Sequence, residues 1–202
     1  LEVGCNHFGE IDYLCKIADP SAGLVTNIGK EHLEFFKDLD GVARAEFELY
    51  DYLKKKSGSI MFLNLDDKFI NKYSKSISHE KRVSYSYGFD SNVKGRFRGY
   101  GKNFQPRIEI ETGGRRYEAQ VSTFGKHSIY NGLAAATVGD FYGVGKGKIK
   151  KALKSFAPSS SKRMEVIKAN GIVIINDAYN SNPDSVKLGL ETLMEADTSG
   201  KK

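Results

Sequence analysis

Short apolar runs alternate with amphipathic stretches through the first 78 residues of this chain, and this alternation most constrains its fold. The runs at 22–28 and 59–64 have the composition of buried strands. The stretches around them have the spacing of helices with one apolar face. Strands that alternate with helices predict a mostly parallel sheet flanked by helices, so we expect an α/β fold. The expected helices cover residues 9–17, 41–56 (with Asp40 as N-cap) and 67–76.

The pattern changes between residues 82 and 124. Runs at 83–87, 107–111 and 117–121 alternate polar and apolar residues and are separated by glycine-rich turns such as Gly113-Gly114. This period of two predicts a small antiparallel β subdomain, inserted at 82–124 beside the main sheet. After it we expect helices over 130–141, 149–156 and 183–195, and two strands over 164–168 and 172–176 that are joined by an Asn170-Gly171 turn.

The composition of the chain excludes several classes of protein. The chain of 202 residues is 40% hydrophobic and 28% charged, which is typical of a globular protein. No apolar run approaches the ~18 residues that a membrane span needs, so we expect no membrane partner. The two cysteines, without a histidine pair at ligand spacing, predict reduced thiols in a cytoplasmic protein. The net charge of +6 favours anionic partners, but no nucleic-acid-binding motif accompanies it, so we expect small molecules and no nucleic acid.

Three side chains form a candidate metal site. Glu2 and His32 come at or after predicted strand ends, where ligands gather in parallel α/β sheets. Glu46 falls on the apolar stripe of the predicted helix, and an unpaired carboxylate there is costly. Carboxylates with one histidine suit magnesium or manganese better than zinc. Two alternatives remain open: Glu46 at the edge of a rotated helix beside Arg44 or Lys30, and His32 as a structural loop residue.

Two further side chains suggest nucleotide binding. Asp177 follows the last predicted strand, in the position from which an aspartate binds a ribose hydroxyl, although it also suits a simple turn. Arg163 precedes a strand and could contact a phosphate or solvent. No Gly-x-x-x-x-Gly-Lys-[Ser/Thr] motif occurs in the chain; the Gly- and Lys-rich stretch at 143–148 follows a helix and lacks the hydroxyl residue. The sequence therefore contains no complete phosphate-binding loop.

Four stretches together resemble the central ATP-binding domain of the Mur ligases. They are EVGCNHFGEI at 2–11, TNIGKEHLE at 26–34, GKHSIYNGLAAA at 125–136 and NDAYNSNPDS at 176–185. Their order spans nearly the whole chain, and the last stretch favours the MurF type, which adds D-alanyl-D-alanine to a UDP-N-acetylmuramoyl tripeptide. The resemblance implies that residues 1–202 are this domain without its P-loop, which would precede Leu1. It also implies an N-terminal UDP-binding domain and a C-terminal domain outside this chain.

The resemblance assigns roles to individual residues. Glu2 would hold a magnesium ion beside the ATP phosphates, and His32 a second one near the acceptor carboxylate. The nucleotide would be bound by a second set, in which Asn131 faces the adenine, Arg163 a phosphate and Asp177 the ribose, together with His127 and Tyr179. The implied reaction is ATP-dependent: the tripeptide carboxylate attacks the γ-phosphate, and the amine of D-alanyl-D-alanine then displaces phosphate from the acyl phosphate.

The sequence departs from the family pattern at two positions. Glu46 stands where the family has a lysine that is carbamylated and helps to hold the second magnesium. A glutamate has the same charge without carbon dioxide, so we expect Glu46 to act as a metal ligand and catalytic residue with His32, directly or through water. Ser128 stands where the family usually has asparagine, so the adenine contacts there are less well defined. Two alternatives stay open: a related ligase for another amine, or a nucleotide-binding module without catalysis. For the chain alone, which lacks the phosphate-binding loop, we expect weak or no ATPase activity.

Overall fold

The computed structural model describes residues 1–101, 105–123, 125–156, 165–178 and 183–195, and it divides into two compact units, Leu1–Lys94 and Gly95–Lys202. Each unit is described by itself. Among the described helices, none combines the length and the apolar character that crossing a membrane requires.

The first unit is built on a parallel sheet. Strand β2 (Ile60–Asn64) lies between β1 (Ala22–Val25) and β3 (Arg82–Ser86), and both neighbours run parallel to it. The start of β4 (Val93–Tyr100) continues this parallel pairing beside β3. The fold class predicted from the sequence is confirmed, but the antiparallel assignment of residues 83–87 is wrong. Residue alternation alone does not distinguish a half-buried parallel strand from a hairpin strand.

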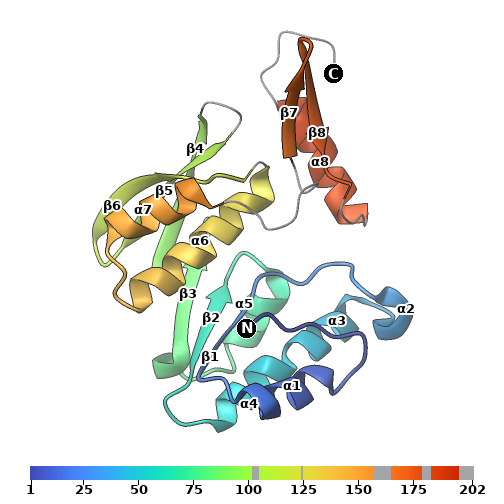
Figure 1. Ribbon diagram of the computed structural model, residues 1–202. Coiled ribbons are helices and arrows are strands. Elements are labelled where there is room, and N and C mark those ends of the chain that lie inside the picture. The colour runs from blue at the N-terminus through green and yellow to red at the C-terminus, as the bar shows by residue number, and fades with distance from the viewer. Residues whose placement is uncertain (102–104, 124, 157–164, 179–182, 196–202) are drawn as a thin grey trace. The chain divides into compact units, whose positions relative to one another are not determined.

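Five α-helices and one 3-10 turn complete the first unit. They are α1 (Glu10–Ala18), α2 (Leu33–Phe36), α3 (Leu39–Glu46), α4 (Glu48–Lys55), α5 (Lys68–Ser74) and η1 (His79–Lys81). The predicted helix at 41–56 is thus two helices that meet at Phe47, and its N-cap is Asp38, which accepts a hydrogen bond from the Gly41 amide at 2.7 Å. Asp40 lies two residues after the cap, within the first turn of the helix. Figure 1 shows α1, α3 and α4 grouped together.

Tyr50 joins α4 to the sheet. Its side chain is fully buried, and its hydroxyl accepts from the Val25 amide at 3.0 Å and donates to the Phe62 carbonyl at 2.7 Å. One phenol therefore satisfies backbone groups of both β1 and β2. Burial raises the pKa of this phenol far above its ordinary value, so it stays a neutral donor.

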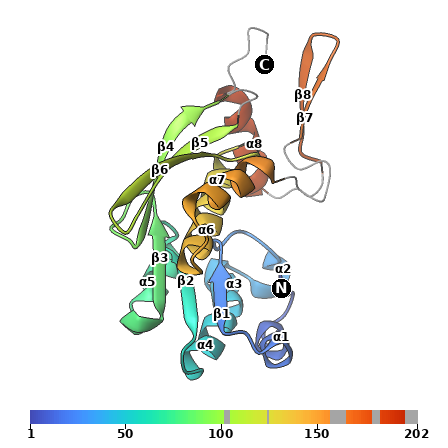
Figure 2. The same ribbon diagram turned by 60° about the vertical axis from the view of Figure 1, so that its left-hand side comes forward.

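The described part of the second unit contains two antiparallel hairpins, and the first of them also neighbours β4 in the same sheet. Strands β5 (Pro106–Thr112) and β6 (Arg115–Gln120) form a hairpin whose turn is Gly113-Gly114, both with positive φ as predicted. Helices α6 (Lys126–Phe141) and α7 (Lys146–Ser155) pack on the same side of this hairpin (Figures 1 and 2). The other pairing joins β7 (Glu165–Ala169) and β8 (Ile172–Asn176) across Asn170-Gly171, and α8 (Pro183–Glu195) follows.

Candidate active site

The loop after β1 carries His32, and two side chains from the β2–α5 connection hold it. The Asp67 carboxylate accepts from the Ile28 amide at 2.9 Å, and the Asn64 amide group donates to the Thr26 carbonyl at 2.9 Å. Asp67 also caps α5, because its other oxygen accepts from the Phe69 and Ile70 amides. The course of the loop is therefore set by a neighbouring strand and helix, and a rigid loop is what a ligand site needs.

His32 adopts a left-handed conformation, with φ of 48° and ψ of 38°, and is the residue from which α2 begins. This conformation is uncommon for a residue other than glycine and is often found at functional sites. The imidazole is about half exposed, with Nδ1 4.0 Å from the Glu34 carboxylate. It is therefore accessible to a ligand.

Glu46 ends α3 with a partly buried carboxylate. Its Oε1 lies 3.9 Å from the Cys5 Sγ, a long contact even for a sulfur donor. Burial and the negative charges of Glu31 and Glu48 raise the pKa of Glu46, while the contact with Cys5 and the nearby His32 lower it. Glu46, Glu31 and His32 are thus close enough to affect one another electrostatically.

Cys5 is close to several acidic side chains. The thiol is buried, and burial together with Glu46, Glu48, Glu10 and Glu31 raises its pKa to about 12. It is therefore a neutral group at physiological pH. Cys5 and Cys15 are both buried free cysteines.

Two carboxylates hold the start of α1 and the segment just before it. Glu48 accepts from the Gly9 amide at 2.6 Å and from the Asp12 amide at 3.1 Å. Glu10 accepts from the Asn6 and His7 amides at 2.6 and 3.0 Å, and these bonds hold the pKa of its carboxyl below the ordinary range. The carboxylates of Glu48 and Glu10 therefore satisfy backbone amides at the start of α1 and in the turn before it.

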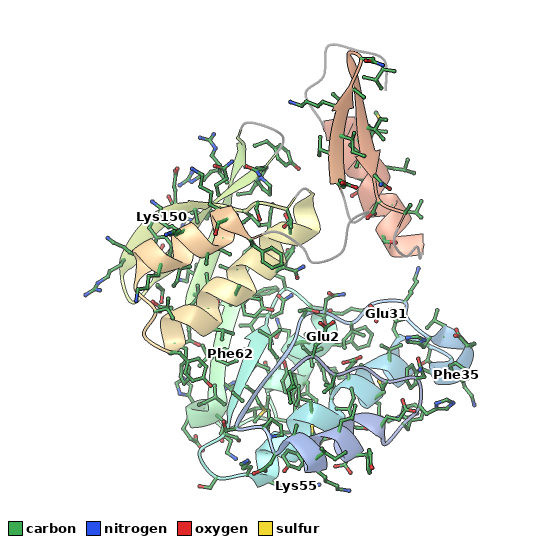
Figure 3. All side chains as sticks on the ribbon, in the orientation of Figure 1. Glu2, Glu31, Phe35, Lys55, Phe62 and Lys150 are labelled. Carbon is green, nitrogen blue, oxygen red and sulfur yellow. The ribbon has the colours of Figure 1, made fainter. Side chains whose placement is uncertain are left out.

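Glu2 lies in a segment without regular structure before α1. Its side chain is exposed, and Figure 3 places it on the segment before α1 and Glu31 on the loop after β1. Within the part of the chain that the structure describes, no group of three or more His, Cys, Asp or Glu side chains has metal-binding geometry. The three-ligand site of Glu2, His32 and Glu46 therefore stays a prediction.

The donor chemistry near Glu46 nevertheless suits a hard divalent cation. Burial is the main cause that raises the pKa of Glu46, repulsion from the negative charge of Glu31 raises it further, and the nearby imidazole of His32 lowers it. A cation would relieve that repulsion, and carboxylate oxygen is the ligand that magnesium prefers. Sequence reasoning did not single out Glu31 or Cys5. Glu31 adjoins His32 in the quoted motif, but an exposed loop glutamate carries no signal of its own.

The predicted nucleotide-binding residues lie in the second unit. Asn131 is exposed on α6, and Asp177 is partly buried just after β8. Ser128 is buried, and its hydroxyl lies 2.6 Å from the Gly125 carbonyl and 2.8 Å from that of Thr123, so it fastens the start of α6. Arg163, Tyr179 and the side chain of His127 lie outside the described residues. The nucleotide set therefore also stays a prediction.

Comparison with known proteins decides the family. The model of the Mur ligase middle domain matches residues 1–139. The chain belongs to this family. As a Mur ligase middle domain, it is 31% identical over 96% of its length to the UDP-N-acetylmuramoyl-tripeptide--D-alanyl-D-alanine ligase of Mycobacterium leprae, and 29% identical over its full length to that of Bacillus subtilis. It covers 39% and 42% of these two relatives, so the chain spans about two fifths of their length.

Solved structures agree with this family assignment. MurF from Acinetobacter baumannii matches 98% of this Mur ligase middle domain with a TM-score of 0.84 and 27% identity, and 42% of the MurF chain is covered. MurF from Thermotoga maritima, solved in complex with ADP, has a TM-score of 0.79 over 93% of this chain at 21% identity, with 42% of its own chain covered, a likeness of fold.

Proposed function

We propose that the protein containing this domain is an ATP-dependent ligase that joins D-alanyl-D-alanine to a UDP-N-acetylmuramoyl tripeptide. The observation that carries this proposal is the 31% identity, over 96% of the chain, to a ligase of that name. Its substrates and partners are then small molecules, and it makes a peptidoglycan precursor in the cytoplasm. The ADP found in the Thermotoga maritima MurF supports ATP as the co-substrate.

The reaction proceeds in two steps. An oxygen of the tripeptide carboxylate attacks the γ-phosphorus, the bond to the β–γ bridging oxygen breaks, and ADP leaves. The amine of D-alanyl-D-alanine then attacks the acyl carbon; phosphate leaves, and the amine loses a proton as the amide forms. Both steps bring negatively charged groups together, so the protein contributes mainly positioning and charge neutralisation.

We assign the acceptor end of this reaction to the first unit. Glu46 and His32, with Glu31 beside them, would hold a magnesium ion, and Glu2 another beside the phosphates. When bound there, such an ion would supply charge neutralisation for the crowded oxygens of the phosphates and the attacking carboxylate. The chain's own residues keep part of this geometry fixed: Asp67 holds the loop that carries His32, and Glu48 holds the start of α1.

We assign the nucleotide to residues of the second unit. Asn131 would face the adenine and Asp177 the ribose, with Arg163 on a phosphate and His127 and Tyr179 beside them. Asp177 directly follows β8, the position from which an aspartate reaches a ribose hydroxyl in other nucleotide sites.

The test is a phosphate-release assay on the full-length protein. We expect phosphate release only when ATP, the UDP-muramoyl tripeptide and D-alanyl-D-alanine are all present, and a panel of other amines identifies a related ligase. Release without dependence on the tripeptide and the dipeptide would contradict the proposal. Glu46 in place of the family lysine favours one second candidate, a module that binds nucleotide without catalysis, and binding of ATP without any turnover would support it.

A further inference from the structure

Arg44 is an exposed cation on α3 that is held by a ring. Its guanidinium carbon lies 4.3 Å from the centroid of the Phe8 ring. Asp40 precedes it by four residues, a spacing that favours an ion pair. Among the described residues, however, Arg44 has no hydrogen bond or ion pair, and its stacking on Phe8 is its one recorded interaction. The forked N–H donors of Arg44 are therefore free to bind an oxyanion.

The ring under Arg44 is itself fixed. Phe8 packs edge to face on the buried Phe36, with centroids 5.1 Å apart. His7, one residue earlier, packs on Phe35 at 4.7 Å, so residues 7 and 8 interlock with α2. The bonds from Glu10 to the backbone of this turn hold it in place. Arg44 is thus positioned before any ligand arrives, which lowers the entropy cost of binding.

The surface around Arg44 is also partly apolar. Phe8, the ring under Arg44, is 45% exposed, and Phe35, which packs on the neighbouring residue His7, is 47% exposed. A free guanidinium beside exposed rings suits a ligand that carries an oxyanion on an otherwise apolar or amphipathic frame. An arginine that only contacts water would require neither a supporting ring nor exposed aromatic side chains nearby.

Arg44 lies near Glu46 but is not part of the same cluster. Cys5 contacts Glu46, and Phe8 contacts Arg44, so residues 5–8 connect the two side chains. Three residue steps span at most about 11 Å. One ligand of peptide size can therefore reach from the Glu46 cluster to Arg44.

We propose that Arg44, supported by Phe8, binds an oxyanion of the acceptor substrate other than its reacting carboxylate. The inference rests on the proposed function, in which the reacting carboxylate lies near Glu46 and His32. The oxyanion is a second carboxylate or a phosphate of the acceptor. The phosphates of ATP are oxyanions too, and the kinetic test below distinguishes ATP from the acceptor substrate as the ligand of Arg44. Arg44 then selects the acceptor by its charge while the exposed rings cover its less polar part.

The test compares Arg44→Gln and Arg44→Lys in the full-length enzyme. A charge-assisted, forked contact gives an expected rise in the KM for the UDP-muramoyl tripeptide of about 10- to 100-fold in Arg44→Gln. We expect kcat and the KM values for ATP and D-alanyl-D-alanine to stay within about twofold. Arg44→Lys should recover part of the loss, because a lysine keeps the charge and lacks the fork. Phe8→Leu, which removes the ring platform, should raise the same KM by a smaller factor.

Lys68→Gln is the matched control. Lys68 is an exposed cation whose Nζ lies 4.9 Å from the centroid of the Phe69 ring, and we expect no change in any KM. Calorimetric titration of the tripeptide substrate into folded wild-type and Arg44→Gln protein gives a second, turnover-free measurement. An unchanged acceptor KM and affinity in Arg44→Gln, or a rise confined to the KM for ATP, would overturn the inference. Failure of the wild-type enzyme to use the tripeptide at all would instead refute the proposed function.

Discussion

Glu46 is an acidic side chain in partly buried surroundings that contain other acidic side chains. It is a partly buried carboxylate beside Cys5; burial and then repulsion from Glu31 and Glu48 raise its pKa, while Cys5 and His32 lower it. Such repulsion costs stability unless a cation or proton relieves it. A cation bound near Glu46 would relieve this repulsion, and this is the hypothesis that the next experiment tests.

Replacing Glu46 tests this explanation. We expect Glu46→Ala in the full-length enzyme to lower kcat/KM by roughly 100-fold, the upper range for groups that orient a metal. Glu46→Lys should regain activity only when bicarbonate is supplied, since a carbamylated lysine then provides the carboxylate. The measurement is phosphate release at several magnesium concentrations, with and without bicarbonate. Full activity of Glu46→Ala would remove Glu46 from the site.

At the scale of elements, the start of α3 shows how the chain positions Glu46. The helix begins after Asp38, whose carboxylate caps it, and Gly41 lies against the preceding turn. A Cβ on Gly41 would come within 2.0 Å of the Phe36 carbonyl oxygen, so only glycine fits there. The close approach of α2 and α3 thus fixes His32 at one end and Glu46 at the other.

The cap can be tested with two neighbouring aspartates. Asp38→Ala should lower the free energy of unfolding by about 1 kcal/mol, because the first turn of α3 loses its acceptor. Asp40→Ala is the matched control and should change it by less than about 0.5 kcal/mol. Denaturant unfolding of both variants measures the difference. Equal effects, or a larger loss in Asp40→Ala, would mean that Asp38 is not the functional cap.

At the scale of the whole molecule, burial is unequal between the two sheets. Met61 and Leu63 of β2 are fully buried, and β2 has a parallel partner on each side. In the β7–β8 hairpin, Ile172 and Ile174 are 62% and 46% exposed. A two-stranded hairpin with exposed side chains contributes little stability of its own.

Hydrogen exchange should reveal this difference. In the 202-residue chain we expect the amides of β2 to exchange slowest and those of β8 to exchange faster by several orders of magnitude. Mass spectrometry of peptides from the two strands makes the comparison within one sample, so β2 serves as the internal control. Protection of β8 equal to that of β2 would show that another part of the protein covers the hairpin.

Local patterns in the sequence determined most of the elements. The alternation of apolar runs predicted β1, β2 and their helices, and Gly113-Gly114 and Asn170-Gly171 predicted both hairpin turns, because positive φ favours these residues. The motif around His32 indicated the family, since its residues lie together in the chain.

Only the tertiary structure decided the rest. It placed residues 82–86 in the parallel sheet, since pairing direction depends on a neighbour that lies far away in sequence. It likewise brought Cys5 and Glu31 to Glu46 and stacked Arg44 on Phe8. Contacts between residues distant in the chain arise only when helices and strands pack, and no local pattern encodes them.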